Sequence, residues 1–372
     1  MNLLYKYALW AAGLLAIVSG YFYFTEQYDI FSSLLIFFFL ALSIGVRGYD
    51  KVRGFSFALL IFSVVSFAMT YPNLLTTWGN FQVKSLIVPL LQIIMFGMGT
   101  SMSIKDFGEV IKSPKAVFIG LVCQFTIMPL IGATLVFIFK FPPEIAAGVI
   151  LIGSSPSGLA SNVMCYIGKA NLALSVTLTT VATLLAPFVT PLLMKLFGGE
   201  LIPIDLWGMM WSIIKITILP IAAGLIFNKL FHGKTQWLDK AMPLVSMGGI
   251  AIILGVITAA GRDNLLTMGA VLILVGLIHN SSGYVLGYWS CRLFRLDEKS
   301  SRTIAFEVGM QNAGLASGLA NEMGKVATVG LAPAVFGPMM NITGSVLASY
   351  WHKNAPTQTD EATSIGQSIS DN

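Results

Sequence analysis

Long apolar stretches alternate with short polar connections along almost the whole chain. A helix needs about 20 predominantly apolar residues to cross a bilayer, and twelve stretches approach or exceed that length. They span residues 8–24, 30–46, 54–70, 84–102, 116–139, 145–166, 171–197, 207–228, 241–260, 265–291, 301–321 and 326–351. The pattern predicts an all-α polytopic membrane protein with about 12 transmembrane helices.

The composition agrees with this pattern. Hydrophobic residues make up 56% of the 372 residues and charged residues only 10%, too few charges for a soluble protein of this size. Cys123, Cys165 and Cys291 lie in apolar segments without metal-ligand spacing, so we expect buried apolar side chains. The lipid bilayer is the expected partner, and nothing in the sequence resembles a patch for binding nucleic acid.

Basic residues are concentrated on one side of the predicted spans. With a cytoplasmic N-terminus, 16 of the 22 lysines and arginines fall in cytoplasmic connections or span ends. The positive-inside rule then predicts a multi-pass protein of the plasma (inner) membrane with both termini in the cytoplasm. Residues 354–372 are polar and slightly acidic, which predicts a disordered cytoplasmic tail. Lys215 falls within a span and is expected to extend its amine toward an interface.

An internal repeat organises the middle and end of the chain. GSSPSGLASN at 153–162 and GMQNAGLASG at 309–318 share GLAS at an offset of 156 residues. That offset carries the other four spans of residues 54–197 onto spans of residues 207–353, and it pairs Gln124 with Asn280. Because each half has five spans, the second half enters the membrane in the opposite orientation, as in secondary transporters.

The repeat also predicts the domain organisation. Two inverted five-helix repeats form one transporter domain over residues 54–353, and residues 1–53 form an N-terminal transmembrane hairpin. The hairpin is interpreted as either an accessory interface or a membrane anchor. The sequence specifies no oligomeric state.

The span at 301–321 carries Glu307 among glycines. An ionised carboxylate at membrane depth costs at least about 2.5–3.5 kcal/mol, so it is rarely left without a partner. Glycines let a helix unwind and expose carbonyl groups, which is tolerated beside a cavity or an ion. We therefore expect a cation site on a broken helix, the alternative being a protonated Glu307 bonded to a neighbouring helix.

The matching span at 145–166 is interrupted by Pro156 between two glycines, where the backbone loses a donor and gains non-helical freedom. Its second half would point a helix N-terminus at the protein centre, which favours anions. The alternative is an ordinary proline kink.

Neutral oxygen ligands follow this break. Ser161 and Asn162 lie just after it, and Ser175 and Thr179 lie one turn apart on the next helix. Hydroxyl and amide oxygens suit a hard monovalent cation. Serine and threonine in membrane helices usually bond a carbonyl of the preceding turn instead, so the cation-site interpretation depends on the carboxylate nearby.

These segments resemble a known family, the bile acid:sodium symporters and their bacterial homologues. The resemblance runs continuously from about Gly54 to Lys353. It is carried by FEVGMQNAGLASG (306–318), GSSPSGLASNVMCYIGKANLALSVTLTT (153–180), CQFTIMP (123–129), MFGMG (95–99), PLVSM (243–247), LIHNSSGY (277–284) and MNITGS (340–345).

The resemblance implies a ten-helix transporter, with a six-helix core and a four-helix panel, coupled to two Na+ ions. One ion site would use Ser161, Asn162, Ser175, Thr179 and Glu307. The other would use Glu307 with Gln124, Gln311 and the backbone oxygens of Val308 and Met310. The organic anion would lie beside Ser157, Gly158, Leu159, Asn312 and Asn341. The residues that flank Gly158 differ from those of close bacterial relatives, so the resemblance does not carry the identity of the anion.

The sequence thus favours Na+-coupled symport of an organic anion, such as a bile acid-like, pantoate-like or keto acid, by alternating access. The alternative is a proton-coupled organic anion transporter that uses Glu307 as the proton carrier. An intramembrane enzyme is less favoured, because the sequence has no HExxH, no paired membrane aspartates and no GxxxxGK. We therefore expect no enzymatic activity.

Overall fold

The computed structural model describes residues 3–49, 52–102, 113–231 and 236–354. The predicted tail at 354–372 lies outside these residues except for Asn354, as do Lys51, Lys105, Lys112 and Lys234 among the basic residues that predict the topology. The described chain is helical apart from a small hairpin of β1 (Thr77–Trp78) and β2 (Phe81–Gln82). In that hairpin Thr77 pairs with Gln82 and Trp78 with Phe81.

The first part of the chain contains the N-terminal hairpin and the first four of the five spans of repeat one, the fourth divided into α8 and α9. Its helices are α1 (Leu3–Phe24), α2 (Tyr28–Val46), η1 (Arg53–Phe55), α3 (Ser56–Thr70), α4 (Asn73–Thr76), η2 (Val83–Leu86), α5 (Ile87–Ser101), α7 (Pro114–Phe139), α8 (Pro143–Gly153) and α9 (Ala160–Ile167).

The second part completes that repeat and contains the other one. Its helices are α10 (Leu172–Gly198), α11 (Leu206–Ile213), the π-helical segment η4 (Ile214–Ile218), α12 (Leu219–Phe231), α13 (Gln236–Ala260), α14 (Arg262–Leu293), α15 (Glu298–Gly309), α16 (Ala313–Glu322) and α17 (Leu331–Lys353).

Ten of the twelve predicted spans correspond, within the described residues, to helices long and apolar enough to cross a membrane. The remaining two, at 145–166 and 301–321, are each divided into two short helices, α8 with α9 and α15 with α16. The prediction of an all-α polytopic membrane protein with two interrupted spans is therefore confirmed.

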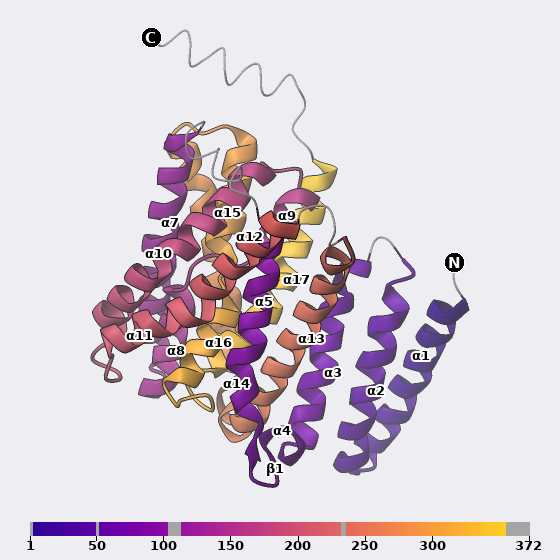
Figure 1. Cartoon of the computed structure of the whole chain (residues 1–372). Helices are drawn as coiled ribbons and strands as arrows, with labels where there is room; N and C mark the ends of the chain where they lie inside the picture. Colours follow the sequence, from indigo (N-terminus) through magenta and orange to yellow (C-terminus); the bar gives the residue numbers. More distant parts are fainter. Residues whose placement is uncertain (1–2, 50–51, 103–112, 232–235, 355–372) are drawn as a thin grey trace.

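The repeat is visible in the helix boundaries and in the packing. Shifting α8 (143–153) by 156 residues gives 299–309, and α15 occupies Glu298–Gly309. Packing is reciprocal: α5 packs against α12 while α13 packs against α3, and α8 packs against α17 while α15 packs against α10. In Figure 1, α3 runs down toward the β-hairpin and its counterpart α12 runs up, as an inverted repeat requires.

The N-terminal hairpin lies at the edge of the molecule, where α2 packs against α3 (Figure 1). Polar groups join the two helices within the apolar surroundings: Ser43 Oγ donates to Ser56 O at 2.8 Å, and Ser63 Oγ donates to Ile36 O at 2.7 Å. Such interhelical hydrogen bonds stabilise packing where lipid is as apolar as the side chains. The hairpin thus continues the layer formed by α3 and α13.

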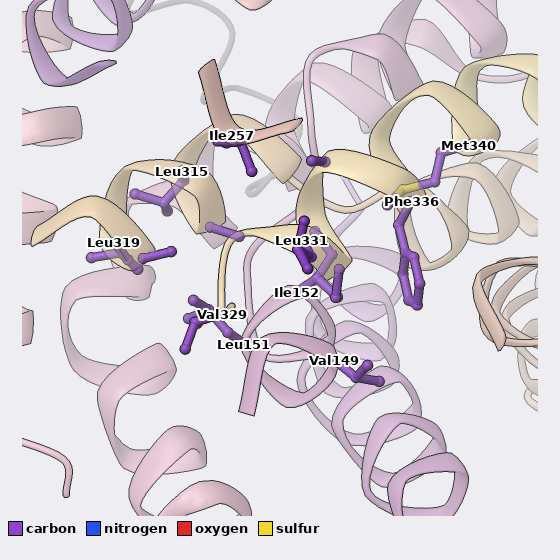
Figure 2. Close-up of a cluster of buried hydrophobic side chains, with 14 of the residues drawn as sticks. Val149, Leu151, Ile152, Ile257, Leu315, Leu319, Val329, Leu331, Phe336 and Met340 are labelled. Carbon is purple, nitrogen blue, oxygen red and sulfur yellow. The ribbon is translucent and has the colours of Figure 1, made fainter. Parts of the chain in front are cut away.

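The buried core lies where α8, α16 and α17 meet. Figure 2 shows this cluster, which includes Val149, Leu151 and Ile152 of α8 with Leu315, Leu319 and Phe336. Gly148 permits a close approach, because a Cβ built there would lie 2.4 Å from the carbonyl oxygen of Val329. Tight packing of this kind, with small residues at the contact, is what holds membrane helices together. It fixes the short helices around the two breaks.

Candidate functional site

The two broken helices cross, and their unwound segments pair with each other. Gly158 N donates to Met310 O and Asn312 N donates to Pro156 O, both at 2.8 Å. Ser157 and Gln311 form an antiparallel bridge between these bonds. Backbone polar groups that leave a helix inside a membrane need partners, and here each break supplies them to the other.

Gly158 is required for this close crossing. A Cβ built at that position would lie 2.9 Å from the carbonyl oxygen of Gln311, so a larger residue would force the strands apart. After the second break, Asn312 caps the following helix, since its Oδ1 accepts from Leu315 N at 2.9 Å. Thus α8 and α15 end, and α9 and α16 begin, on the two sides of one crossing.

Glu307, near the end of α15, is buried at 2% exposure beside this crossing. Four hydroxyl groups donate to its carboxylate. Ser161 and Ser175 donate to Oε1 at 2.6 Å each, Ser157 donates to Oε2 at 2.6 Å and Thr179 donates to Oε2 at 2.9 Å. A set of four donors suits the ionised carboxylate, which only accepts hydrogen bonds.

These hydroxyl groups also crowd around other oxygens. Ser175 Oγ lies 2.6 Å from Glu307 Oε1 and 2.7 Å from Asn162 Oδ1, although a hydroxyl has one proton for the two acceptors. Thr179 Oγ1 is shared in the same way, at 2.9 Å from Glu307 Oε2 and 3.3 Å from Asn162 Oδ1. Oxygens that outnumber their protons make a favourable environment for a hard cation. The structure thus brings together all five residues of the first expected ion site.

Residues expected at the second ion site are joined to one another by hydrogen bonds. Gln124 Nε2 donates to Gln311 Oε1 at 2.7 Å and to Ser155 O at 3.0 Å, and Gln311 Nε2 donates to Val308 O at 2.6 Å. Within the described residues, Gln124 Oε1 is buried without a hydrogen-bond donor, an unusual state for a buried amide oxygen. Met310 O accepts from Gly158 N, and no hydrogen bond joins Glu307 to either glutamine in the described chain.

A cavity lies between the crossing and the helices α3, α5, α13 and α17. The empty space it encloses is about 850 Å³, counting its opening to solvent. Of the residues expected to contact the anion, the walls include Gly158, Leu159, Asn312 and Asn341. The side chains around it are mostly apolar, and none of the described residues on its walls is charged.

Ser157 is placed differently from the other four residues expected around the anion. It is 1% exposed, is absent from the cavity walls and donates to Glu307. The structure therefore groups it with the carboxylate. The antiparallel pairing with Gln311 at the crossing turns the side chain of Ser157 toward Glu307. This pairing is a tertiary contact, so the local sequence does not reveal it.

The sequence also leaves the role of Asn280 unassigned. Its Nδ2 donates to Gly309 O at the end of α15, and Thr343 donates to its Oδ1. The offset of 156 residues pairs Asn280 with Gln124, which donates to Ser155 O at the other break. Each repeat thus supplies one amide side chain to a carbonyl freed by its own broken helix. The pairing of Gln124 with Asn280 at the 156-residue offset is the sequence signal that indicates this role.

No basic side chain among the described residues compensates the charge of Glu307, because none forms an ion pair with it. The described chain also has no cluster of three or more His, Cys, Asp or Glu residues that could hold a metal ion. The oxygens around Glu307 are instead those of hydroxyl, amide and carbonyl groups, which suit hard cations.

The fold and the crossing define a polytopic α-helical membrane transporter built from two inverted repeats. The sequence profile of the sodium bile acid symporter family matches residues 88–268. YocS of Bacillus subtilis (strain 168), described as an uncharacterized sodium-dependent transporter, is 42% identical over 311 residues, covering 83% of this chain and 94% of YocS. The chain belongs to the sodium bile acid symporter family, which confirms the resemblance.

Plant relatives extend the comparison. The probable sodium/metabolite cotransporter BASS1, chloroplastic, of Arabidopsis thaliana is 34% identical over 271 residues, covering 73% of this chain and 68% of its own length. Its counterpart of the same name in Oryza sativa subsp. japonica is 31% identical over 275 residues, with the same coverage of each chain. These relatives are named as transporters, and none of the three carries the name of an enzyme.

Proposed function

We propose that the protein imports a small organic anion together with two Na+ ions by alternating access. In this proposal one Na+ binds among Ser161, Asn162, Ser175, Thr179 and Glu307, and the other among Glu307, Gln124, Gln311 and the carbonyl oxygens of Val308 and Met310. The anion binds in the cavity at the crossing. The names of the relatives support sodium as the coupling ion.

The observation that carries the proposal is the buried carboxylate of Glu307. It is surrounded by oxygens and has no basic partner in the described chain. A buried charge is stable only when it is compensated, and a cation in the oxygen cluster would compensate it. Bound Na+ would also fix α9, α10 and α15 relative to each other, because its ligands come from all three helices.

The second ion is supported by the orphaned oxygen of Gln124. Gln124 Oε1 is buried without a donor in the described residues, and a cation would satisfy it. Met310 O is bonded to Gly158 N in this structure. Since a carbonyl oxygen has two lone pairs, that bond leaves it able to coordinate an ion.

Ion binding and anion binding are linked through the crossing. The backbone bonds between the breaks join Gly158, on the cavity wall, to Met310, three residues after Glu307. A cation that orders this crossing would therefore order the anion site. Two Na+ with one monovalent anion move one net positive charge inward, and a membrane potential of about 100 mV contributes roughly 2.3 kcal/mol to that step.

The cavity suits an amphipathic anion of modest size. Its apolar walls fit a hydrocarbon portion, and its polar end lies at the two helix N-termini, which favour negative charge. Bile acid-like, pantoate-like and keto acids all share this chemistry. We place both termini in the cytoplasm and the protein in the plasma membrane, as the distribution of basic residues predicts.

Uptake in proteoliposomes tests the coupling. Purified protein should accumulate pyruvate, pantoate or cholate when Na+ is present outside, and should fail to do so when K+ replaces Na+. Accumulation that ignores Na+ and follows an imposed pH gradient would contradict Na+ coupling and favour the proton-coupled alternative, with Glu307 as the proton carrier.

A further inference from the structure

The N-terminus of α16 opens on the cavity, and one of its backbone N–H groups has no acceptor in the described chain. The first amides of a helix lack acceptors within the helix, and each needs a partner elsewhere. Most of them have one here: Asn312 N donates to Pro156 O, Ala313 N donates to Gln311 O and Leu315 N donates to Asn312 Oδ1. Gly314 N, between the last two, has no acceptor among the described residues, and Gly314 lies on the cavity wall.

One turn further along the same face, the hydroxyl of Ser317 is a second donor without an acceptor in the described chain. Its side chain is 1% exposed, lies on the cavity wall and has a hydroxyl without a hydrogen-bond partner in the described chain. Several other buried hydroxyls donate to the preceding turn, as Ser155 does to Leu151 O and Thr183 does to Thr179 O, both within 2.8 Å. Ser317 makes no such bond, although it costs free energy to bury a hydroxyl unpaired.

The repeat pairs Ser317 with Ser161, whose hydroxyl has a hydrogen-bond acceptor in the structure. An offset of 156 residues carries Ser161 onto Ser317, the serine of each GLAS string. Ser161 donates to Glu307 on the side of the oxygen cluster. Ser317 lies on the cavity wall, where no carboxylate of the described chain accepts its proton.

We propose that Gly314 N–H and Ser317 O–H bind the carboxylate end of the transported anion. The inference rests on the proposed function and adds Ser317, which neither the sequence nor the resemblance singled out. No charged side chain lies on the described cavity wall, so neutral donors must recognise the anion. A helix N-terminus supplemented by a hydroxyl is suited to this task. The glycine at 314 leaves the amide uncovered by a side chain.

Thermal-shift titration of Ser317→Ala tests this assignment. Pyruvate, pantoate and cholate are titrated in Na+ against wild type and variant, each beside its uncharged primary amide. The carboxylate that stabilises the wild type should bind the variant roughly 10- to 100-fold more weakly, as expected for loss of a hydrogen bond to a charged group. Affinity for the amide should change much less.

Thr217→Val is the matched control. Thr217 also has a buried hydroxyl without a partner in the described chain, but it is not on the cavity wall. This variant should bind the carboxylate like the wild type, and both variants should keep the Na+-dependent increase in Tm, which shows that they fold and bind the ion.

The outcomes separate the two proposals. Equal carboxylate affinity in Ser317→Ala and wild type would overturn the role of Ser317 and leave the proposed function intact. Equal weakening for the carboxylate and its amide would also overturn it, because the variant would then have lost general packing. If no anion stabilises the wild type in Na+, the proposed function fails, and this inference fails with it.

Discussion

Glu307 brings a negative charge to the crossing of the two broken helices, and among the described residues its four hydroxyl donors bond no other carboxylate. Glu307→Gln keeps the shape and removes the charge. We expect the variant to remain folded and to lose the Na+-dependent increase in Tm, because a neutral amide cannot balance the charge of a bound cation. Differential scanning fluorimetry in Na+ and in K+ measures this.

Glu144→Gln serves as the control for that measurement. Glu144 forms an ion pair with Lys325 and accepts from Thr328 at 2.6 Å, away from the crossing. Its variant should keep the response to Na+. A Glu307→Gln protein that still responds to Na+ like the wild type would remove the carboxylate from the ion site.

Thr179 offers a finer test, because a matched hydroxyl lies one turn away. Thr179→Val removes an oxygen shared between Glu307 and Asn162, and we expect the apparent Na+ affinity to fall roughly tenfold. Thr183→Val removes a hydroxyl that only donates to Thr179 O and should leave that affinity nearly unchanged. Titration of Tm against Na+ compares the two, and similar losses in both would point to helix packing instead of ion coordination.

Single residues also show where sequence reasoning stops. The sequence alone offered Ser161, Asn162, Ser175 and Thr179 as candidate ligands near Glu307, and the family resemblance added Gln124 and Gln311. Ser157 was expected beside the anion, yet pairing between the breaks turns it to Glu307. Lys215 was expected at an interface, and its Nζ lies 3.5 Å from Glu322 Oε2 on another helix. Both contacts join residues more than 100 positions apart in the sequence, which local pattern cannot reveal.

At the scale of the helices, the internal repeat predicts which two spans are interrupted. Proline and glycine disturb a helix, but they do not always break one, because Pro129, Pro187 and Pro338 lie inside the continuous helices α7, α10 and α17. The related segments at 153–162 and 309–318, rich in glycine and polar residues, are what indicate the two breaks. The pairing of one break with the other could not follow in that way. It depends on how α8, α16 and α17 pack, and that packing is set by side chains from distant segments.

A substitution at Gly148 tests how closely α8 packs against the segment before α17. In Gly148→Ala the new Cβ would lie 2.4 Å from Val329 O, a backbone atom that cannot rotate away. We expect a loss of about 1–3 kcal/mol in the free energy of unfolding, typical of overpacking. Thermal unfolding in detergent measures it as a lower Tm.

Gly13→Ala in α1 is the comparison, because a Cβ there has no atom within 4 Å. Alanine favours a helix over glycine by up to about 1 kcal/mol, so this Tm should be unchanged or slightly higher. If Gly148→Ala matched it, the contact between α8 and the segment before α17 would be looser than the structure shows.

At the scale of the whole molecule, transport by alternating access requires one group of helices to move against another. The helices α3, α5 and α13 pack together with the continuous span formed by α11, η4 and α12, and the helices α7 to α10 and α14 to α17 surround the crossing (Figure 1). One polar link between the groups joins Lys215 and Ser212 to Glu322 at the end of α16. The N-terminal hairpin attaches to α3 through Ser43 and Ser56, whose hydroxyls lie 3.4 Å apart, and should therefore move with the first group.

Cross-linking compares these two connections directly. Lys215→Cys with Glu322→Cys, joined by a short bifunctional thiol reagent, should stop Na+-driven uptake, and a cleavable reagent should restore it on reduction, because the bridge ties moving groups together. Ser43→Cys with Ser56→Cys, joined in the same way, should leave uptake unchanged, since both residues belong to one group. Uptake that survives the first cross-link would rule out motion between these groups as the transport step. Uptake lost with the second would show that the hairpin moves independently of α3 and belongs to the transport machinery.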